Sequence, residues 1–81
     1  KNLESALAAA RTTVELSPAN ASSWGVLAAV HQKLKNFDAA IKAGEKAVEV
    51  ADENRKAYYR SRLDSIKQAR EADGGQSKKG K

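Results

Sequence analysis

The chain repeats its own sequence at a spacing of 34 residues, so that residues 3–20 align on residues 37–54 without a gap. The identical pairs are Ala6/Ala40, Ala9/Ala43, Val14/Val48, Glu15/Glu49 and Asn20/Asn54, and the apolar matches are Leu3/Phe37, Leu7/Ile41 and Leu16/Val50. A fixed period of roughly 20 to 50 residues is typical of stacked supersecondary units, which bury their apolar faces against neighbouring copies. The period therefore predicts a stacked scaffold of the kind that serves binding.

Composition limits the size and the chemistry of this scaffold. With 81 residues and 41% hydrophobic content, the chain forms one small domain with a limited core. Its apolar mass comes from Ala, Val, Leu and Ile, which suits helices that approach one another closely. The absence of Cys excludes disulfides and thiolate metal sites. No apolar run reaches the roughly 18 residues needed to span a bilayer, so we expect no membrane insertion.

Helical periodicity divides the chain into four segments. The predicted helices span residues 2–16, 21–34, 37–51 and 55–72. Pro18 ends the first helix, because proline cannot continue the preceding hydrogen-bond ladder. Asn20 and Asn36 are the expected N-caps of the second and third helices.

We expect a disordered tail at the C-terminal end of the chain and a cut or processed N-terminal end. Gly74-Gly75 is expected to stop the fourth helix, and residues 73–81 are expected to form a disordered basic tail, since they have little apolar surface to bury. The first residue is not Met and lies inside a helical pattern, which suggests an excised fragment or a processed product. The sequence favours the cytoplasm only by default, because it carries no targeting signal that we recognise.

Residues 21–54 carry a motif with defined spacing. The positions that match the pattern W-x2-L-G-x2-Y, then A-x3-F and P, are Trp24, Leu27, Ala28, Ala40, Ala47 and, at the end of the preceding unit, Pro18. The segment resembles the tetratricopeptide repeat, although His31 and Gly44 replace the two later aromatics and Asp52 replaces the closing proline. By this spacing Trp24 is expected to anchor the core.

The resemblance implies an all-α fold of antiparallel helical hairpins, a fragment of an α-solenoid with about four helices. Under this alignment residues 1–20 resemble the second helix of a preceding unit, residues 21–54 form one complete repeat, and residues 55–72 form a C-terminal capping helix. The family implies a non-catalytic scaffold that binds a peptide in a groove lined by the first helix of each pair. Its groove positions on the second helix here are Ser22, Gly25, Val26, Ala29, Gln32 and Lys33.

The last helix is unusually basic, since residues 55–70 contain six basic residues and one acidic residue. Such a run is often only a solvated face, but it also suits an acidic protein or peptide partner. The candidate residues for meeting carboxylates are Lys56, Arg60, Lys67 and Arg70. Lys56 and Arg60 also have the Lys-x3-Arg spacing of the family's carboxylate clamp, but Val26 and Ala29 occupy the positions where that clamp needs Asn.

Contact with RNA or another polyanion is the alternative interpretation. The basic fourth helix and the Lys78-Lys79-Gly80-Lys81 tail would then bind phosphates, and Tyr58 and Tyr59 would stack on bases. Tyrosines at the start of a capping helix more often fill a core, so nucleic acid is the less favoured partner. Steep weakening of binding by salt distinguishes this mode from peptide binding.

Residues for catalysis are missing from the sequence. His31 is the single histidine and has no Cys, second His or acidic residue at metal-binding spacing, so it is expected to serve packing. The Ser and Thr residues lack a base and an orienting acid in any helical register, and Gly74-Gly75 does not lie between a strand and a helix as a phosphate loop does. We therefore expect no enzyme, no metal and no cofactor.

The first helix is expected to have more apolar surface than one neighbour can cover. Its stripe of Leu3, Leu7 and Val14 is expected to bury one face and to take part in self-association. We therefore expect the isolated chain to form a symmetric homodimer in which the two first helices are in contact.

Overall fold

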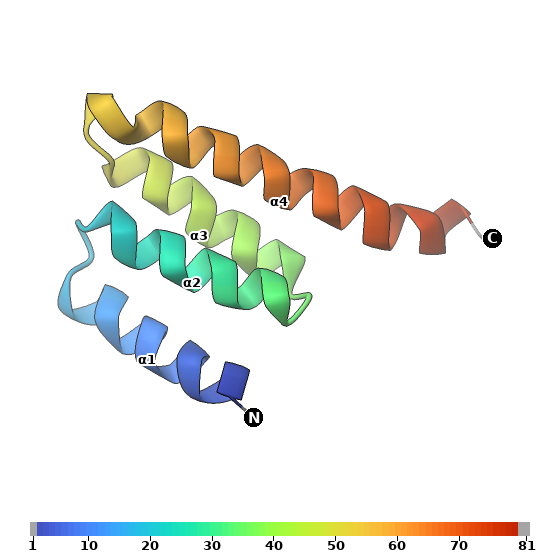
Figure 1. Ribbon diagram of the computed structural model, residues 1–81, viewed down its shortest axis with the longest axis horizontal. Helices are drawn as coiled ribbons and strands as arrows, with labels where there is room; N and C mark the ends of the chain where they lie inside the picture. The colour runs from blue at the N-terminus through green and yellow to red at the C-terminus, as the bar shows by residue number, and fades with distance from the viewer. Residues whose placement is uncertain (1, 80–81) are drawn as a thin grey trace.

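A computed structural model describes residues 2–79 and, for residues 74–79, the backbone alone. It contains the helices α1 (Asn2–Leu16), α2 (Ala21–Lys33), α3 (Phe37–Val50) and α4 (Glu53–Lys79), as Figure 1 shows. Over the described residues every element is a helix, which confirms the predicted all-α class. Whether the chain belongs to a longer solenoid stays an expectation of the resemblance.

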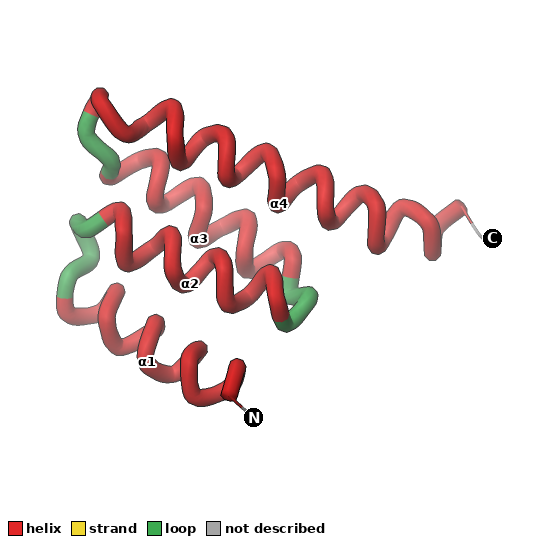
Figure 2. Tube along the Cα trace, viewed as in Figure 1, coloured by secondary structure: helices red, strands yellow, loops and turns green. Residues whose placement is uncertain are grey.

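Consecutive helices run in opposite directions, so α2 and α4 point the same way (Figure 2). α3 packs against both α2 and α4, whereas α1 packs mainly against α2. The Cα trace measures 42 × 32 × 13 Å along its principal axes, which makes the molecule a thin slab. A slab one to two helices thick leaves much of each helix at the surface.

The turn between α1 and α2 is held by three groups that the sequence identified. The Asn20 side chain accepts a hydrogen bond from the Ser22 backbone N–H at 2.9 Å, as expected of an N-cap. The Trp24 indole N–H donates to the Pro18 carbonyl at 2.7 Å. This bond satisfies the polar end of Trp24 and fixes the turn against the first turn of α2.

The turn between α2 and α3 is held by backbone hydrogen bonds and not by the predicted side-chain cap at Asn36. The Asn36 side chain makes no capping hydrogen bond. Instead, the Asn36 backbone N–H donates to the His31 carbonyl at 2.8 Å and the Lys35 N–H donates to the Gln32 carbonyl at 2.9 Å. Lys35 has a φ of 65°, in the left-handed region. This is the paired-bond ending of a helix in which glycine is the usual residue at the left-handed position.

The core consists of two adjoining clusters of mostly small side chains. The buried members of the first are Ala10, Val14, Leu27, Ala28, Ala40, Ala43 and Ile66, and those of the second are Ala47, Ala51 and Tyr59. Trp24 packs against both clusters but is only partly buried, because its indole edge reaches the turn at Pro18. Trp24 thus lies where the sequence predicted, against the core, but it is less buried than a core anchor would be.

Gly44 on α3 allows α4 to approach closely. A Cβ at this position would lie 3.0 Å from Leu63 Cδ1 and 3.7 Å from Ile66 Cδ1. The small residue thus leaves room for two buried side chains of α4. Tyr59, Leu63 and Ile66 form the buried face of α4.

The predicted end of α4 is wrong. The helix continues past Ala72 and through Gly74-Gly75 to Lys79, so residues 73–79 are not a disordered tail; Gly80 and Lys81 lie outside the described residues. Glycine keeps its backbone N–H and costs only about 1 kcal/mol relative to Ala in a helix, which weakens a long helix without ending it. Among the described residues no glycine has a positive φ, so neither acts as a left-handed helix end.

The residues expected to drive self-association mostly face the interior. Val14 is 7% exposed, and Leu7 packs against the first cluster. Leu3 is partly buried, while Leu16 at the end of α1 is 79% exposed. The stripe is used within the chain because α2 covers it, so Leu7 and Val14 do not form an open dimer surface.

Candidate binding groove between α2 and α4

A groove of about 300 Å³ runs between α2 and α4. Its walls are formed by Ser22, Gly25, Val26, Ala29, Val30, Lys33, Tyr58, Tyr59 and Arg62. Five of the six α2 residues predicted as groove positions are among them; Gln32 is the exception and is partly buried elsewhere. The structure therefore brings the predicted α2 residues together, and it adds three residues from α4.

The floor of the groove forms because Gly25 lacks a side chain. A Cβ on Gly25 would lie 3.0 Å from Cε1 of the Tyr59 ring. The Tyr59 ring is buried and packs against the second core cluster. Gly25 thus lets this ring lie close against α2, and a Cβ at that position would require the ring to shift by a few tenths of an ångström.

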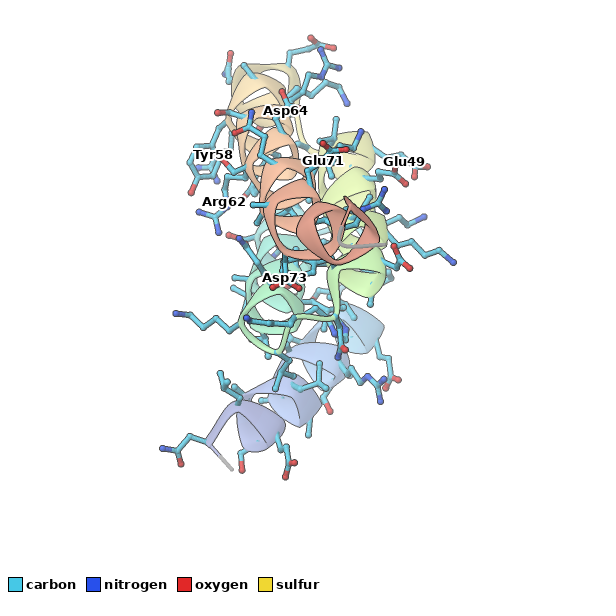
Figure 3. All side chains as sticks on the ribbon, turned by 90° about the vertical axis from the view of Figure 1, so that its right-hand side faces the viewer. Glu49, Tyr58, Arg62, Asp64, Glu71 and Asp73 are labelled. Atoms are coloured by element: carbon cyan, nitrogen blue, oxygen red, sulfur yellow. The ribbon has the colours of Figure 1, made fainter. Side chains whose placement is uncertain are left out.

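Tyr58 and Arg62 form the α4 wall. They lie one helical turn apart, and Figure 3 shows them on the same side of α4, while Glu49 lies on the opposite side of the molecule. Arg62 Cζ is 5.7 Å from the centroid of the Tyr58 ring, and Arg62 Nη1 is 3.4 Å from Tyr58 Oη. The Tyr58 ring also meets the Tyr59 ring edge-on, with centroids 4.9 Å apart. Tyr58 thereby holds the guanidinium at the groove while remaining 56% exposed itself.

The groove carries positive charge without an acidic counterpart. Lys33 and Arg62 are its charged lining residues, and no Asp or Glu is among the residues that line it. Within residues 2–73 the ion pairs use the cations Lys35, Lys46 and Arg70, which leaves both groove cations unpaired. Val26, also in the wall, is 55% exposed. Within residues 2–73 the groove thus combines exposed apolar surface with two cations that have no carboxylate partner.

The basic residues predicted on α4 lie outside the groove. The Lys56 ammonium donates to the Val48 carbonyl at 2.7 Å and so caps the end of α3. Arg70 pairs with Asp38 across 3.0 Å. Both therefore serve α3–α4 packing. Arg60 and Lys67 are exposed and line neither of the described hollows.

Sequence reasoning overlooked Arg62 as a binding residue. The basic run of the fourth helix pointed instead to Lys56, Arg60, Lys67 and Arg70, and the first two also have the spacing of a family motif. The signal for Arg62 was nonetheless present: once Tyr59 and Leu63 are assigned to the buried stripe, the residues just before them, Tyr58 and Arg62, share the flank next to it. The helix register, not the motif spacing, identifies the cation that faces α2.

His31 is buried, as expected of a packing residue, with 7% of its surface exposed. Its Nδ1 has no hydrogen-bond partner among the described residues. Burial, and secondly the charge of Arg11, lower the pKa of His31 below its ordinary value of 6.5. The neutral imidazole is therefore the form that packs.

A second hollow, of about 620 Å³, lies where the α1–α2 turn meets the α3–α4 turn. Pro18, Asn20, Asp52 and Arg55 are among its lining residues. The Asn20 side chain is already used as a helix cap, and the Asp52 side chain accepts from the Arg55 backbone N–H at 3.2 Å. Polar groups in this hollow thus mainly stabilise the two turns.

The described residues contain neither a metal-binding cluster nor a membrane-spanning helix. No cluster of three or more His, Asp or Glu side chains is placed to hold a metal ion. None of the described helices combines the length and the apolar character required to cross a bilayer.

Comparisons with known proteins add no family assignment. No family model matches the chain, and no curated protein or solved structure matches it either. The tetratricopeptide resemblance therefore rests only on the motif positions within residues 21–54 and on the 34-residue period.

Proposed function

We propose that the chain is a non-catalytic protein-interaction module that binds a partner segment in the groove between α2 and α4. The observation that carries the proposal is the composition of this groove. Val26 and Tyr58 expose apolar surface beside Lys33 and Arg62, two cations without a carboxylate partner among the side chains that the structure describes. Exposed apolar surface bordered by polar residues is the usual mark of an interaction site.

The size of the groove favours a peptide segment over a compact small molecule. Its volume of about 300 Å³ is at the lower end of the range of ligand pockets, and the groove opens along two parallel helices. A segment lying along it places one or two side chains in the hollow. The fixed wall of Tyr58 and Arg62 reduces the conformational entropy lost on binding.

The resemblance to tetratricopeptide repeats supports the same proposal. It implies peptide binding on the face that carries Gly25, Val26 and Ala29, and these residues line the groove. It implies no catalysis.

The proposal is tested by selecting binders from a displayed library of random decapeptides against the wild-type chain. The decisive variant is Val26→Glu, which puts a carboxylate on the groove wall at an exposed position. Leu16→Glu is the matched control, because it also replaces an exposed aliphatic residue by Glu but lies on α1. Selected peptides are expected to lose at least about tenfold in affinity for the first variant and less than about twofold for the control.

If the selected peptides bind both variants equally, the groove is not the site. Binding that needs no Val26 surface and collapses between low and high salt points to the polyanion alternative instead.

A further inference from the structure

The distribution of charge along the groove selects among peptide partners. This inference rests on the proposed function and concerns the chemistry of the segment that occupies the same groove. The apolar wall residues Val26 and Tyr58 lie nearer the start of the two helices, whereas Lys33 and Arg62 follow them along the chain. Because α2 and α4 run in the same direction, both cations lie toward the same end of the groove (Figure 1).

The distances along the helices set a spacing. Tyr58 and Arg62 are four residues apart, which corresponds to about 6 Å along a helix axis, and Val26 and Lys33 are seven residues apart, about 10 Å. An extended peptide advances about 3.3 Å per residue. A side chain placed between Val26 and Tyr58 therefore lies about two residues from the level of Arg62 and about three residues from the level of Lys33.

We infer that the groove binds an internal segment with an apolar residue followed or preceded, two or three residues away, by Asp or Glu. The apolar side chain packs between Val26 and Tyr58. The carboxylates pair with Arg62 and Lys33, which have no carboxylate partner within residues 2–73. No lining residue supplies a negative charge to oppose them.

Arg62 is the more selective of the two cations. Its guanidinium lies beside the Tyr58 ring and hydroxyl, a contact that restricts its side-chain freedom before a carboxylate binds. Lys33 is an exposed ammonium on a flexible stem, which tolerates variation in the position of the second acid. The groove therefore requires the nearer acid more strictly than the farther one.

The test uses a labelled peptide with blocked ends, acetyl-Gly-Glu-Glu-Ser-Leu-Ser-Glu-Glu-Gly-amide, and the full-length chain. Its acids lie two and three residues from Leu in both directions, so it fits either orientation, and it has no free terminal carboxylate. The comparison peptides replace every Glu by Gln, replace Leu by Ser, or move the acids to five and six residues from Leu. Fluorescence anisotropy gives the four affinities.

The first peptide is expected to bind roughly fivefold to tenfold tighter than the Gln peptide and the wide-spaced peptide. Arg62→Gln is expected to remove most of this preference, and Arg60→Gln, an equal change of charge at an exposed position outside the groove, to leave it. Equal binding of the Glu and Gln peptides overturns the inference, as does an equal effect of the two Arg variants.

The variant Val26→Glu separates this inference from the proposed function. If the wild type binds the Glu and Gln peptides equally and Val26→Glu abolishes binding of both, the groove is a binding site without acidic preference, and only the inference fails. If it changes the affinity of neither peptide, the proposed function fails as well.

Discussion

The two copies of the 34-residue repeat differ in what lies beside them. Ala40 and Ala43 on α3 are 0% and 3% exposed, whereas their identical equivalents on α1 are partly buried at Ala6 and exposed at Ala9. α3 has α2 on one side and α4 on the other, while α1 packs mainly against α2. These alanines are therefore core on α3 and more exposed on α1, because α3 has a second neighbouring helix. Val14 and Val48 differ the other way, since Val14 is buried and Val48 is partly buried.

The helices α2 and α4 show the same effect at equivalent positions. Trp24 on α2 packs against both core clusters, but Tyr58, 34 residues later, is 56% exposed. α4 instead buries a face turned by one residue, which includes Tyr59 and Leu63. This change of register turns Tyr58 and Arg62 toward α2 and so creates the groove wall.

The largest expected effect compares Trp24→Ala with Tyr58→Ala. The first removes a large partly buried ring and its hydrogen bond to Pro18, and we expect it to lower the free energy of unfolding by about 3 kcal/mol. The second is expected to change it by no more than about 0.5 kcal/mol. Urea unfolding followed by circular dichroism measures both; equal losses at the two positions would contradict the difference in neighbours.

A direct test of the two copies compares Ala43→Leu with Ala9→Leu. Leucine at Ala43 must fit into a core with no free space, at a cost of about 1–3 kcal/mol. Leucine at the exposed Ala9 is expected to be neutral within about 0.5 kcal/mol. Thermal melts of the two variants check this. A large loss at Ala9 would show that another group covers that face of α1.

The α1–α2 turn uses a side-chain cap, whereas the α2–α3 turn places Lys35 at a positive φ, and Lys35→Gly tests the strain in the second turn. The side chain of Lys35 is strained at a φ of 65°, and glycine relieves this strain, so we expect a gain in the free energy of unfolding of about 1 kcal/mol. The lost ion pair to Asp73 is exposed and contributes little. Lys33→Gly, at the last helical residue of α2, is the control and is expected to lower stability instead of raising it.

His31 gives the smallest effect, as a dependence of stability on pH. Because burial and Arg11 lower the pKa of folded His31, the unfolded chain binds a proton more readily than the folded chain. Its contribution to stability is therefore complete above about pH 6.5 and declines as pH falls below the unfolded pKa. The equivalent residue on α4, Ser65, is exposed and does not titrate.

The measurement is the urea midpoint between pH 7.5 and pH 5, for the wild type and for His31→Gln. The wild type is expected to lose more stability on acidification than the variant. Parallel pH profiles for the two would mean that His31 is already solvated in the folded chain.

The fold was largely predictable because its signals are local. Apolar spacing identified three of the four helices to within about a residue. The end of α4 was not predictable from Gly74-Gly75, since glycine lowers helix stability without forbidding the helix.

The site was predictable on one helix and not on the other. The α2 residues follow from the resemblance, because the face opposite Leu27 and Ala28 is left over once those residues pack. On α4 the basic run pointed to Lys56 among others, but that ammonium caps α3, a contact between residues that only the folded turn brings together. Long polar side chains have many reachable partners, so their roles depend on tertiary structure more than those of apolar residues do.

The most direct test of the groove is chemical-shift mapping of the uniformly 15N-labelled chain during titration with the blocked Glu-Leu-Glu peptide described above. The account predicts that the largest changes occur at the amides of Gly25, Ala29 and Arg62, with little change on α1 and at Lys67. Changes centred on α1, or spread evenly along the basic residues of α4, would contradict the claim that this groove is the binding site.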